Sequence, residues 1–163
     1  MTNPFRILMV ACAACLVPLA HAQVAVVPAT SQELLLASTD ARLAANKRLV
    51  YDFWREVYEA GHMELAGKYM AEGYVQHNPN VPTGRAAFVD FFAKNVAPQP
   101  IDSRIKAPLI AILAEGDLVV LAFVREAADP KDPTKKYTTT WFDMFRIEDG
   151  KIAEHWDAAT KRL

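Results

Sequence analysis

Cysteine is almost missing from this sequence. The chain has two, Cys12 and Cys15, and both lie close to its start. The rest of the chain therefore has no residue that could form a disulfide, act as a thiolate nucleophile or bind a metal through sulfur. It must be stabilised by a hydrophobic core. A chain of this length buries roughly two-thirds of its unfolded surface, so we expect one domain.

The sequence also lacks an excess of charge of either sign, internal repeats and low-complexity tracts. Eighteen Lys and Arg residues stand against 19 Asp and Glu residues, which gives a formal net charge of −1. Proteins that bind nucleic acid or anionic membranes usually carry a clear excess of basic residues. We therefore expect neither partner for this chain.

Long apolar runs are missing apart from one near the start. Residues 7–19, ILMVACAACLVPL, are apolar but fall short of the ~20 residues that span a bilayer. Arg6 precedes this run, and AHA at residues 20–22 follows it as a small-x-small cleavage site, which is the pattern of a secretory signal peptide. We predict that residues 1–22 are removed and that the protein is exported, to the periplasm or outside the cell. The mature form then has no membrane segment.

A lipoprotein leader that uses Cys12 or Cys15 is the alternative, but neither cysteine follows the usual leucine and small-residue pattern. Cleavage as a secretory leader leaves 17 Lys and Arg against 19 Asp and Glu. We predict that residues 23–38 are a flexible, poorly packed lead-in and that residues 39–163 form the domain.

The first half of this domain has the periodicity of helices. Apolar residues recur at spacings of three and four from Leu43 to Tyr58, and Gly61 follows them as a helix end. We predict helices over about 40–60, 63–71 and 84–96. Between the last two, YVQHNPNVPTG is a short extended piece followed by a proline-containing loop.

The second half changes character after Pro100. Four runs of β-branched and aromatic residues are separated by turn residues: RIKAPLIAILAEGD, LVVLAFVREAAD, KYTTTWFDMFRIEDG and KIAEHWDAAT. These runs predict four antiparallel strands joined by hairpins. Helices followed by a meander of strands indicate an α+β domain.

The last hairpin decides which side chains of KIAEHWD share a face with the preceding strand. Neighbouring residues of a strand point to opposite faces, so His155 and Asp157 share one face and Trp156 lies on the other. If the DG of RIEDG is a two-residue loop, Asp157 pairs with Phe142. A slip by one residue would exchange the two faces.

We favour a three-residue loop, EDG, because its glutamate suits a type I turn and Gly150 suits a left-handed position. Asp157 then lies opposite Trp141, and His155 lies opposite Asp143. All four side chains share one face. A compact group of ionisable side chains facing helices is the kind of cluster in which pKa values shift.

The segments YVQHNPNVPTGRAAFVDFF and TTWFDMFRIEDGKIAEHWDAAT resemble the SnoaL-like polyketide cyclase family, within the nuclear transport factor 2-like superfamily. The resemblance covers roughly residues 40–160. It implies a cone-shaped fold, in which a curved antiparallel sheet surrounds a pocket and three N-terminal helices close it. A family resemblance of this kind does not define the reaction.

In the cyclases of this family no cofactor is used, and an aspartate at the position of Asp157 acts as acid and base in an intramolecular aldol condensation. The resemblance therefore implies a catalytic role for Asp157 and no cofactor. The cyclases carry a glutamine and a histidine at the positions of Trp141 and Asp143. This sequence departs from the family at both, so the resemblance does not extend to the substrate.

Further residues are candidates for the same site. His155 could donate to Asp157 or to substrate, or be a half-buried histidine bonded to Asp143. His77 could point into the pocket mouth as a polarising group, or be a loop histidine bonded to the backbone. Tyr51 and Trp54 on the first helix could bind an apolar ligand beside Trp141 and Asp143, although an aromatic stripe more often belongs to the core.

A metal site is a further interpretation of the same residues. Two histidines and a carboxylate can hold a divalent ion, which would recruit His77, Asp143, His155 and Asp157. The His-x-Asp pattern is common by chance, however, and the resemblance implies a metal-free site. We predict none.

Two functions from different classes fit these residues. The first is a cofactor-independent cyclase, isomerase or dehydratase that removes a proton next to the carbonyl of a small apolar substrate. The second is a protein that binds a small ligand in the same pocket without chemistry. We favour the enzyme. The apolar side chains Phe142, Met144 and Trp156 share the opposite face of the sheet, and we expect them to be covered by a second subunit in a homodimer.

Overall fold

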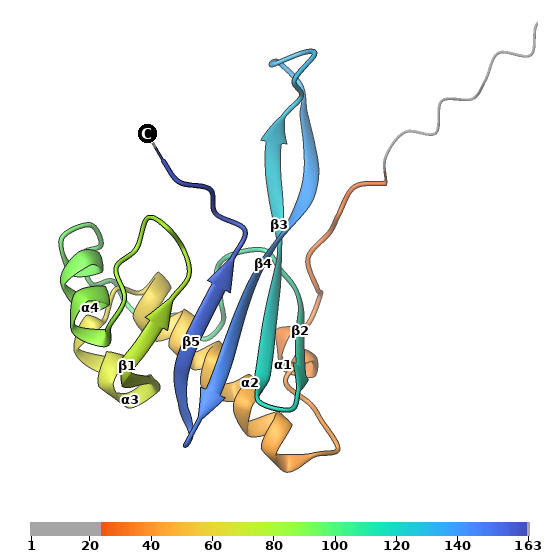
Figure 1. The fold of residues 1–163 in the computed structure, drawn as a ribbon. Helices are drawn as coiled ribbons and strands as arrows, with labels where there is room; N and C mark the ends of the chain where they lie inside the picture. Colours follow the sequence, from red (N-terminus) through yellow and green to blue (C-terminus); the bar gives the residue numbers. More distant parts are fainter. Residues whose placement is uncertain (1–23, 163) are drawn as a thin grey trace, which may run out of the picture.

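Helices come first along the chain and most of the strands follow, as in the predicted α+β arrangement (Figure 1). The computed structural model describes residues 24–162, so the predicted signal peptide lies outside the described residues. Within them, no helix is long and apolar enough to cross a bilayer.

The first long helix agrees with the prediction. The helix α2 (Ala41–Phe53) begins at Asp40, whose side chain accepts hydrogen bonds from the main-chain N–H groups of Arg42 and Leu43, as an N-cap residue does. It continues as a π-helical segment, η1 (Trp54–Glu59). The chain leaves the helix at Gly61, whose φ of 76° is the left-handed value expected of a C-terminal glycine.

The second predicted helix is shorter than expected. A 3₁₀ turn, η2 (Met63–Leu65), leads into the four-residue helix α3 (Ala66–Tyr69), and the chain becomes the strand β1 (Met70–Gln76). The prediction of helix to residue 71 is wrong because pairing of Met70 with Ile152 of the last strand outweighs the local helical pattern. The third predicted helix is α4 (Arg85–Ala93).

The four predicted strands are confirmed, and β1 adds a fifth. They are β2 (Leu109–Glu115), β3 (Leu118–Ala128), β4 (Lys136–Glu148) and β5 (Lys151–Asp157), in the sheet order β1-β5-β4-β3-β2. Pairs from β2 to β5 are antiparallel, as predicted. The pair of β1 and β5 is parallel, so the prediction of an entirely antiparallel sheet is wrong at this edge.

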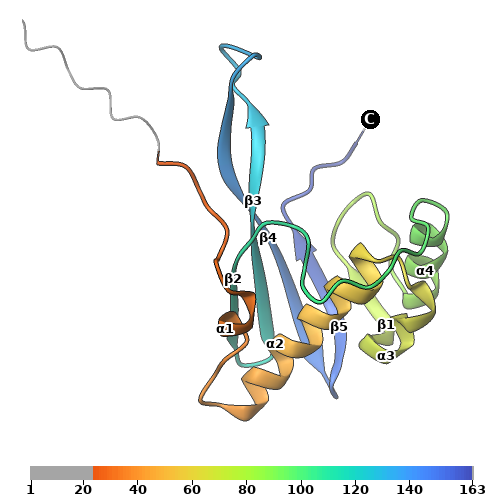
Figure 2. The ribbon, with the colours of Figure 1, turned by 180° about the vertical axis from the view of Figure 1, so that it is seen from behind.

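The sheet is curved and open, and the helices lie on one of its faces. Figure 2 shows α2 crossing this face, with α3 and α4 beside β1. Inward side chains of the strands, such as Leu121, Phe145 and Ile152, pack with Val50 and Val57 of the helices in one core cluster. This arrangement agrees with the predicted fold, in which N-terminal helices close a curved sheet around a pocket.

The predicted poorly packed lead-in packs against the sheet. It contains the short helix α1 (Gln32–Leu35), followed by the buried Leu36. The main-chain N–H of Ala29 donates to the carbonyl of Leu109 at 2.8 Å, and the Gln32 side chain donates to the carbonyl of Ile105 at 2.9 Å. The expectation of poor packing is therefore wrong for this part of the lead-in.

The turn between β4 and β5 differs from the predicted three-residue loop. Glu148 pairs with Lys151, which leaves a two-residue loop of Asp149 and Gly150. Their φ angles are 50° and 70°, both in the left-handed region that type I′ hairpin turns require. The preference for the EDG loop is wrong.

A β-bulge then corrects the register. Ile147 pairs with Ile152 but Arg146 pairs with Glu154, so Ala153 is an extra residue in β5. Beyond the bulge, Asp157 lies opposite Asp143. The predicted pairs of residues are therefore wrong. The predicted shared face is right, because the bulge shifts β5 by one residue and reverses the effect of the shorter turn.

Candidate active site

A cavity of about 610 Å³ lies between the helices and the inner face of the sheet. This volume is in the range of sites that hold a small organic ligand. Eight of its seventeen lining residues have aromatic side chains from the helices and the sheet: Phe53, Trp54, Tyr58, Tyr74, Phe88, Phe91, Phe92 and Phe145. The polar lining residues are Gln76, Asn78, Asn80, Asn95, Asp143, His155, Asp157 and Arg162.

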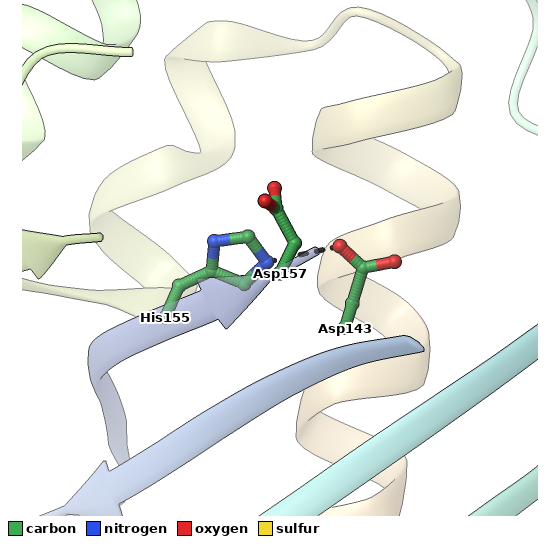
Figure 3. Close-up of side chains that lie close together, drawn as sticks. All are labelled: Asp143, His155 and Asp157. Atoms are coloured by element: carbon green, nitrogen blue, oxygen red, sulfur yellow. Dashed lines mark hydrogen bonds and ion pairs between the residues drawn. The ribbon is translucent and has the colours of Figure 1, made fainter. Parts of the chain in front are cut away.

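Asp143 and His155 form a buried pair at this cavity. The two side chains come from β4 and β5, and His155 Nε2 lies 3.0 Å from Asp143 Oδ1 (Figure 3). Only 4% of Asp143 and 7% of His155 is exposed. The second carboxyl oxygen of Asp143, Oδ2, is buried and has no hydrogen-bond partner among the described residues. A buried polar atom without a partner is rare in folded proteins. The side chain of Trp141, from the same strand, also acts on this carboxyl group and opposes the rise in its pKa that burial causes.

Gln76 of β1 determines which nitrogen of His155 carries a proton. Its Oε1 lies 2.8 Å from His155 Nδ1 and accepts the main-chain N–H of Asn78 at 3.0 Å. Because a main-chain N–H can only donate, the amide oxygen of Gln76 must face it. His155 Nδ1 therefore donates to the same oxygen. The Gln76 amide N–H in turn donates to the Tyr74 hydroxyl at 2.9 Å.

One proton must then lie between His155 Nε2 and Asp143 Oδ1. Either an imidazolium donates to a carboxylate, or a carboxylic acid donates to a neutral imidazole, because two lone pairs at 3.0 Å would repel each other. Burial raises the pKa of Asp143, the bond to and charge of His155 lower it, and the net direction is upward. The pair is therefore a buried store for one exchangeable proton.

Asp157 lies beside this pair at the end of β5 (Figure 3). Its Oδ2 accepts the side-chain N–H of Asn78 at 2.7 Å, and its Oδ1 accepts the main-chain N–H of Ala159 at 2.8 Å. These two bonds fix the carboxylate while each oxygen keeps a free lone pair. One potential ligand atom from each of Asp143, His155 and Asp157 lies within 4.8 Å of the others.

Two tyrosines supply hydroxyl groups to the cavity. Burial raises the pKa of Tyr74, and the charges of Asp157 and Asp143 raise it further, so the phenol keeps its proton. The hydroxyl accepts a bond from Gln76, and its own hydrogen has no acceptor among the described residues. Partial burial and the same two aspartates also raise the pKa of Tyr58. Both hydroxyls are therefore hydrogen-bond donors at neutral pH.

Four of the seven residues predicted for the site line the cavity, namely Asp143, His155, Asp157 and Trp54. His77 does not. Its ring stacks on Trp156 of the opposite sheet face, and its Nε2 lies 2.7 Å from Glu154 Oε1. The expectation that His77 points into the pocket is wrong, because it follows Gln76 on the strand and so faces the other way.

Tyr51 and Trp141 also lie outside the cavity lining. The Tyr51 hydroxyl donates to Gln32 Oε1 at 2.7 Å, deep between α2 and the lead-in, so the prediction of a ligand contact is wrong. Trp141 shares the inner face with Asp143, as predicted. It lies two residues nearer the start of β4, under the Arg125 guanidinium. Neither ring faces the cavity.

No strong pattern in the sequence indicates the polar residues of β1 and of the loop after it. Tyr74 and Gln76 lie in a segment that was predicted only as a short extended piece, with no partner strand, so the face that they share with His155 was not visible. Asn78 stabilises the turn after β1, since its Oδ1 accepts the main-chain N–H of Asn80 at 2.9 Å. Its second role, the bond to Asp157, depends on the parallel pairing of β1 and β5.

A metal ion could be held here only by Asp143, His155 and Asp157, as far as the described residues show. His77, part of the alternative set, lies on the other face of the sheet. His155 already donates its Nδ1 proton to Gln76, which is how metal-ligating histidines are commonly oriented. A cation at Nε2 would have to replace the proton shared with Asp143.

The geometry and the sequence agree with a known family. The sequence pattern of the SnoaL-like domain matches residues 50–155 of the chain. The chain therefore belongs to the SnoaL-like domain family, which is consistent with the nuclear transport factor 2-like superfamily. A comparison with curated proteins gave no significant match.

Solved structures share this fold. A protein from Jannaschia sp. CCS1, provisionally described as a SnoaL-like polyketide cyclase, is 16% identical with a TM-score of 0.50, over 75% of this chain and 91% of its own. A provisional polyketide cyclase from Acidithiobacillus ferrooxidans is 21% identical with a TM-score of 0.49, over 74% and 89%. An LEH-like epoxide hydrolase from M. tuberculosis is 12% identical with a TM-score of 0.49, over 71% and 83%. At 16% identity, the likeness to the Jannaschia protein shows the fold alone.

Proposed function

We propose that this protein is a cofactor-independent enzyme that removes a proton next to the carbonyl group of a small, largely apolar substrate. Cyclase, isomerase and dehydratase reactions all begin with this step. The observation that carries the proposal is the buried Asp143–His155 pair, with its shared proton, beside the Asp157 carboxylate in an aromatic cavity. Membership of the SnoaL-like domain family supports the same class of reaction.

Asp157 is the proposed base. Asn78 and Ala159 hold its two oxygens by hydrogen bonds, so the carboxylate has a fixed direction and keeps lone pairs for a substrate C–H. Removal of an α-proton moves negative charge onto the carbonyl oxygen of the substrate. The base must therefore act together with a hydrogen-bond donor for that oxygen.

Tyr74 is the proposed donor for the developing oxyanion. Its hydroxyl is oriented by Gln76 and has a hydrogen free to donate. The sequence suggests His77 or His155 for this role. His77 lies outside the cavity, and both nitrogens of His155 already make hydrogen bonds. The Asp143–His155 pair, which shares one proton, lies beside Asp157 without adding a second negative charge to the site.

The test does not need the physiological substrate. The exchange of the α-protons of 2-tetralone in D₂O, followed by proton NMR, reports the proposed step directly. We expect the protein to accelerate this exchange and Asp157→Asn to lower the rate by ~10²–10⁴-fold, the usual cost of a lost general base. Glu72→Gln, at an exposed carboxylate of β1 outside the cavity, is the matched control.

The melting temperatures of both variants separate catalysis from folding. An Asp157→Asn variant that melts like the wild type and has lost exchange supports the proposal. Exchange at the wild-type rate in that variant would remove Asp157 from the mechanism. Binding of 2-tetralone without any acceleration of exchange would favour the alternative function, a small-ligand-binding protein.

We also propose that the enzyme is exported and works in the periplasm or outside the cell. The support is the leader pattern of residues 1–22. Expression of the full chain in a bacterial host with an active export system should give a mature protein that begins at Gln23. Intact-mass measurement of the exported protein checks this, and a mature chain that still begins at Met1 would contradict it.

A further inference from the structure

Arg162 is the one lysine or arginine in the cavity lining, and it follows the last strand. Its side chain makes no ion pair or hydrogen bond with any described residue. Most other arginines of the described chain are engaged, for example Arg48 with Glu33 and Arg146 with Glu154. Arg162 therefore brings an unpaired guanidinium group to the wall of a cavity whose other lining residues are aromatic, neutral polar or acidic, apart from His155 and Val81.

The position of this arginine is fixed through its main chain. The N–H of Arg162 donates to Asn80 Oδ1 at 2.8 Å, and Asn80 Nδ2 donates to the carbonyl of Thr160 at 2.9 Å. The main chain at Ala159 is in turn bonded to Asp157. Asn80 also lines the cavity, so the same residue anchors the tail and forms part of the wall.

The charge of the cavity explains what this arginine can do. The Asp143–His155 pair with its single shared proton carries no net charge, and Asp157 contributes a negative one. An anionic ligand would be repelled by Asp157 unless a cation lay elsewhere in the lining. The guanidinium of Arg162 is such a cation, and its planar donor groups match carboxylate and phosphate oxygens. Its charge also lowers the pKa of Tyr58, although burial dominates there.

We propose that Arg162 binds an anionic group of the ligand while the aromatic wall holds an apolar ring system. The substrate class is then an aromatic or alicyclic carbonyl compound that carries a carboxylate or phosphate. This inference rests on the proposed function in taking the same cavity as the substrate site. It adds a specificity-determining residue that lies on the C-terminal tail, outside the strands and helices.

Isothermal titration calorimetry with two probes of equal shape tests the charge preference. The two probes are the anionic 2-naphthoate and the neutral 2-naphthamide. A third compound, 2-naphthyl phosphate, shows whether the site prefers a phosphate or a carboxylate. The measured quantity is the ratio of the Kd for the amide to the Kd for the anion. We expect Arg162→Gln to lower this ratio about tenfold, as loss of a charged hydrogen bond does. Arg162→Lys should lower it less, because the charge remains.

Lys161→Gln is the matched control, since Lys161 is the neighbouring exposed cation and does not line the cavity. It should leave the ratio unchanged. An unchanged ratio in Arg162→Gln, an equal effect of Lys161→Gln, or no binding of any probe would overturn the inference. The 2-tetralone exchange assay keeps the two proposals apart. Exchange with no charge preference contradicts only the role of Arg162, and charge preference without exchange contradicts only the catalytic proposal.

Discussion

At the scale of single residues, the proton shared by Asp143 and His155 is defined by a chain of side chains that starts at the main chain. The N–H of Asn78 orients Gln76, Gln76 fixes the proton on His155 Nδ1, and the remaining proton lies toward Asp143. None of these four residues is a strong acid or base in isolation. The hydrogen bonds and the burial together give the pair its chemical character.

Asp143→Asn tests the charge state of this pair through stability. A carboxyl group whose pKa is raised by folding keeps its proton in the folded state after the unfolded state has lost it, so its contribution to stability falls as pH rises from 3.8 through the raised pKa. Asparagine does not titrate. We expect the free energy of unfolding of the wild type, minus that of the variant, to decrease as the pH rises from about 4 through the raised pKa.

Urea denaturation at several pH values in this range measures that difference. Asp129→Asn, at a loop carboxylate outside the active-site cavity, is the control and should show no such decrease. A difference that grows with pH would show that attraction to His155 outweighs burial. The pKa of Asp143 would then be lowered by folding.

At the scale of elements, the sequence predicts the strands well and their connections poorly. The runs that became β2 to β5 are rich in β-branched and aromatic residues and are separated by turn residues, which is the pattern of strands joined by hairpins. The start of β1 was predicted as helix, and its pairing was missed, because MAEGYVQ is not rich in β-branched and aromatic residues and its partner β5 lies far along the chain. Gln76 and Tyr74 were therefore absent from the predicted site.

The β4–β5 hairpin shows why a face can be predicted when the turn is not. Side chains alternate between the two faces along β4 and β5. Phe142, Met144 and Trp156 share one face, so Asp143, His155 and Asp157 share the other, which faces the helices. Turn length alone would have reversed this arrangement. The extra residue Ala153 restores it, and a bulge of one residue leaves no clear pattern in the sequence.

The turn itself can be tested with Gly150→Ala. Gly150 has a φ of 70°, a conformation that costs a residue with a Cβ roughly 1–2 kcal/mol. We expect the variant to lose about that much free energy of unfolding, measured by urea denaturation. Gly73→Ala is the matched control, because Gly73 has no positive φ and an added Cβ would meet no atom within 4 Å. Equal effects of both substitutions would contradict the left-handed turn.

At the scale of the whole molecule, the two faces of the sheet differ sharply. The helices cover the inner face, which holds the cavity, and within residues 24–162 no helix lies on the outer face (Figures 1 and 2). The strand pairings align Leu113, Val120, Met144 and Trp156 in one row across this outer face. The neighbouring Phe142 has half of its surface exposed. An apolar row of this kind on a bare sheet is typical of a surface that contacts another protein.

We therefore keep the prediction of a homodimer that packs through the outer faces of two sheets. Phe142→Lys should convert the dimer to a monomer, because a lysine at the centre of an apolar interface would lose its hydration. Light scattering coupled to size exclusion, at micromolar concentration, measures the mass. Tyr137→Lys, at an exposed aromatic residue near the start of β4, is the control and should stay dimeric.

A wild-type mass equal to one chain would contradict the prediction. A dimer that survives Phe142→Lys would show that the contact lies on another surface. In either case the cavity and its tail arginine belong to a single chain, so α-proton exchange should not depend on the oligomeric state.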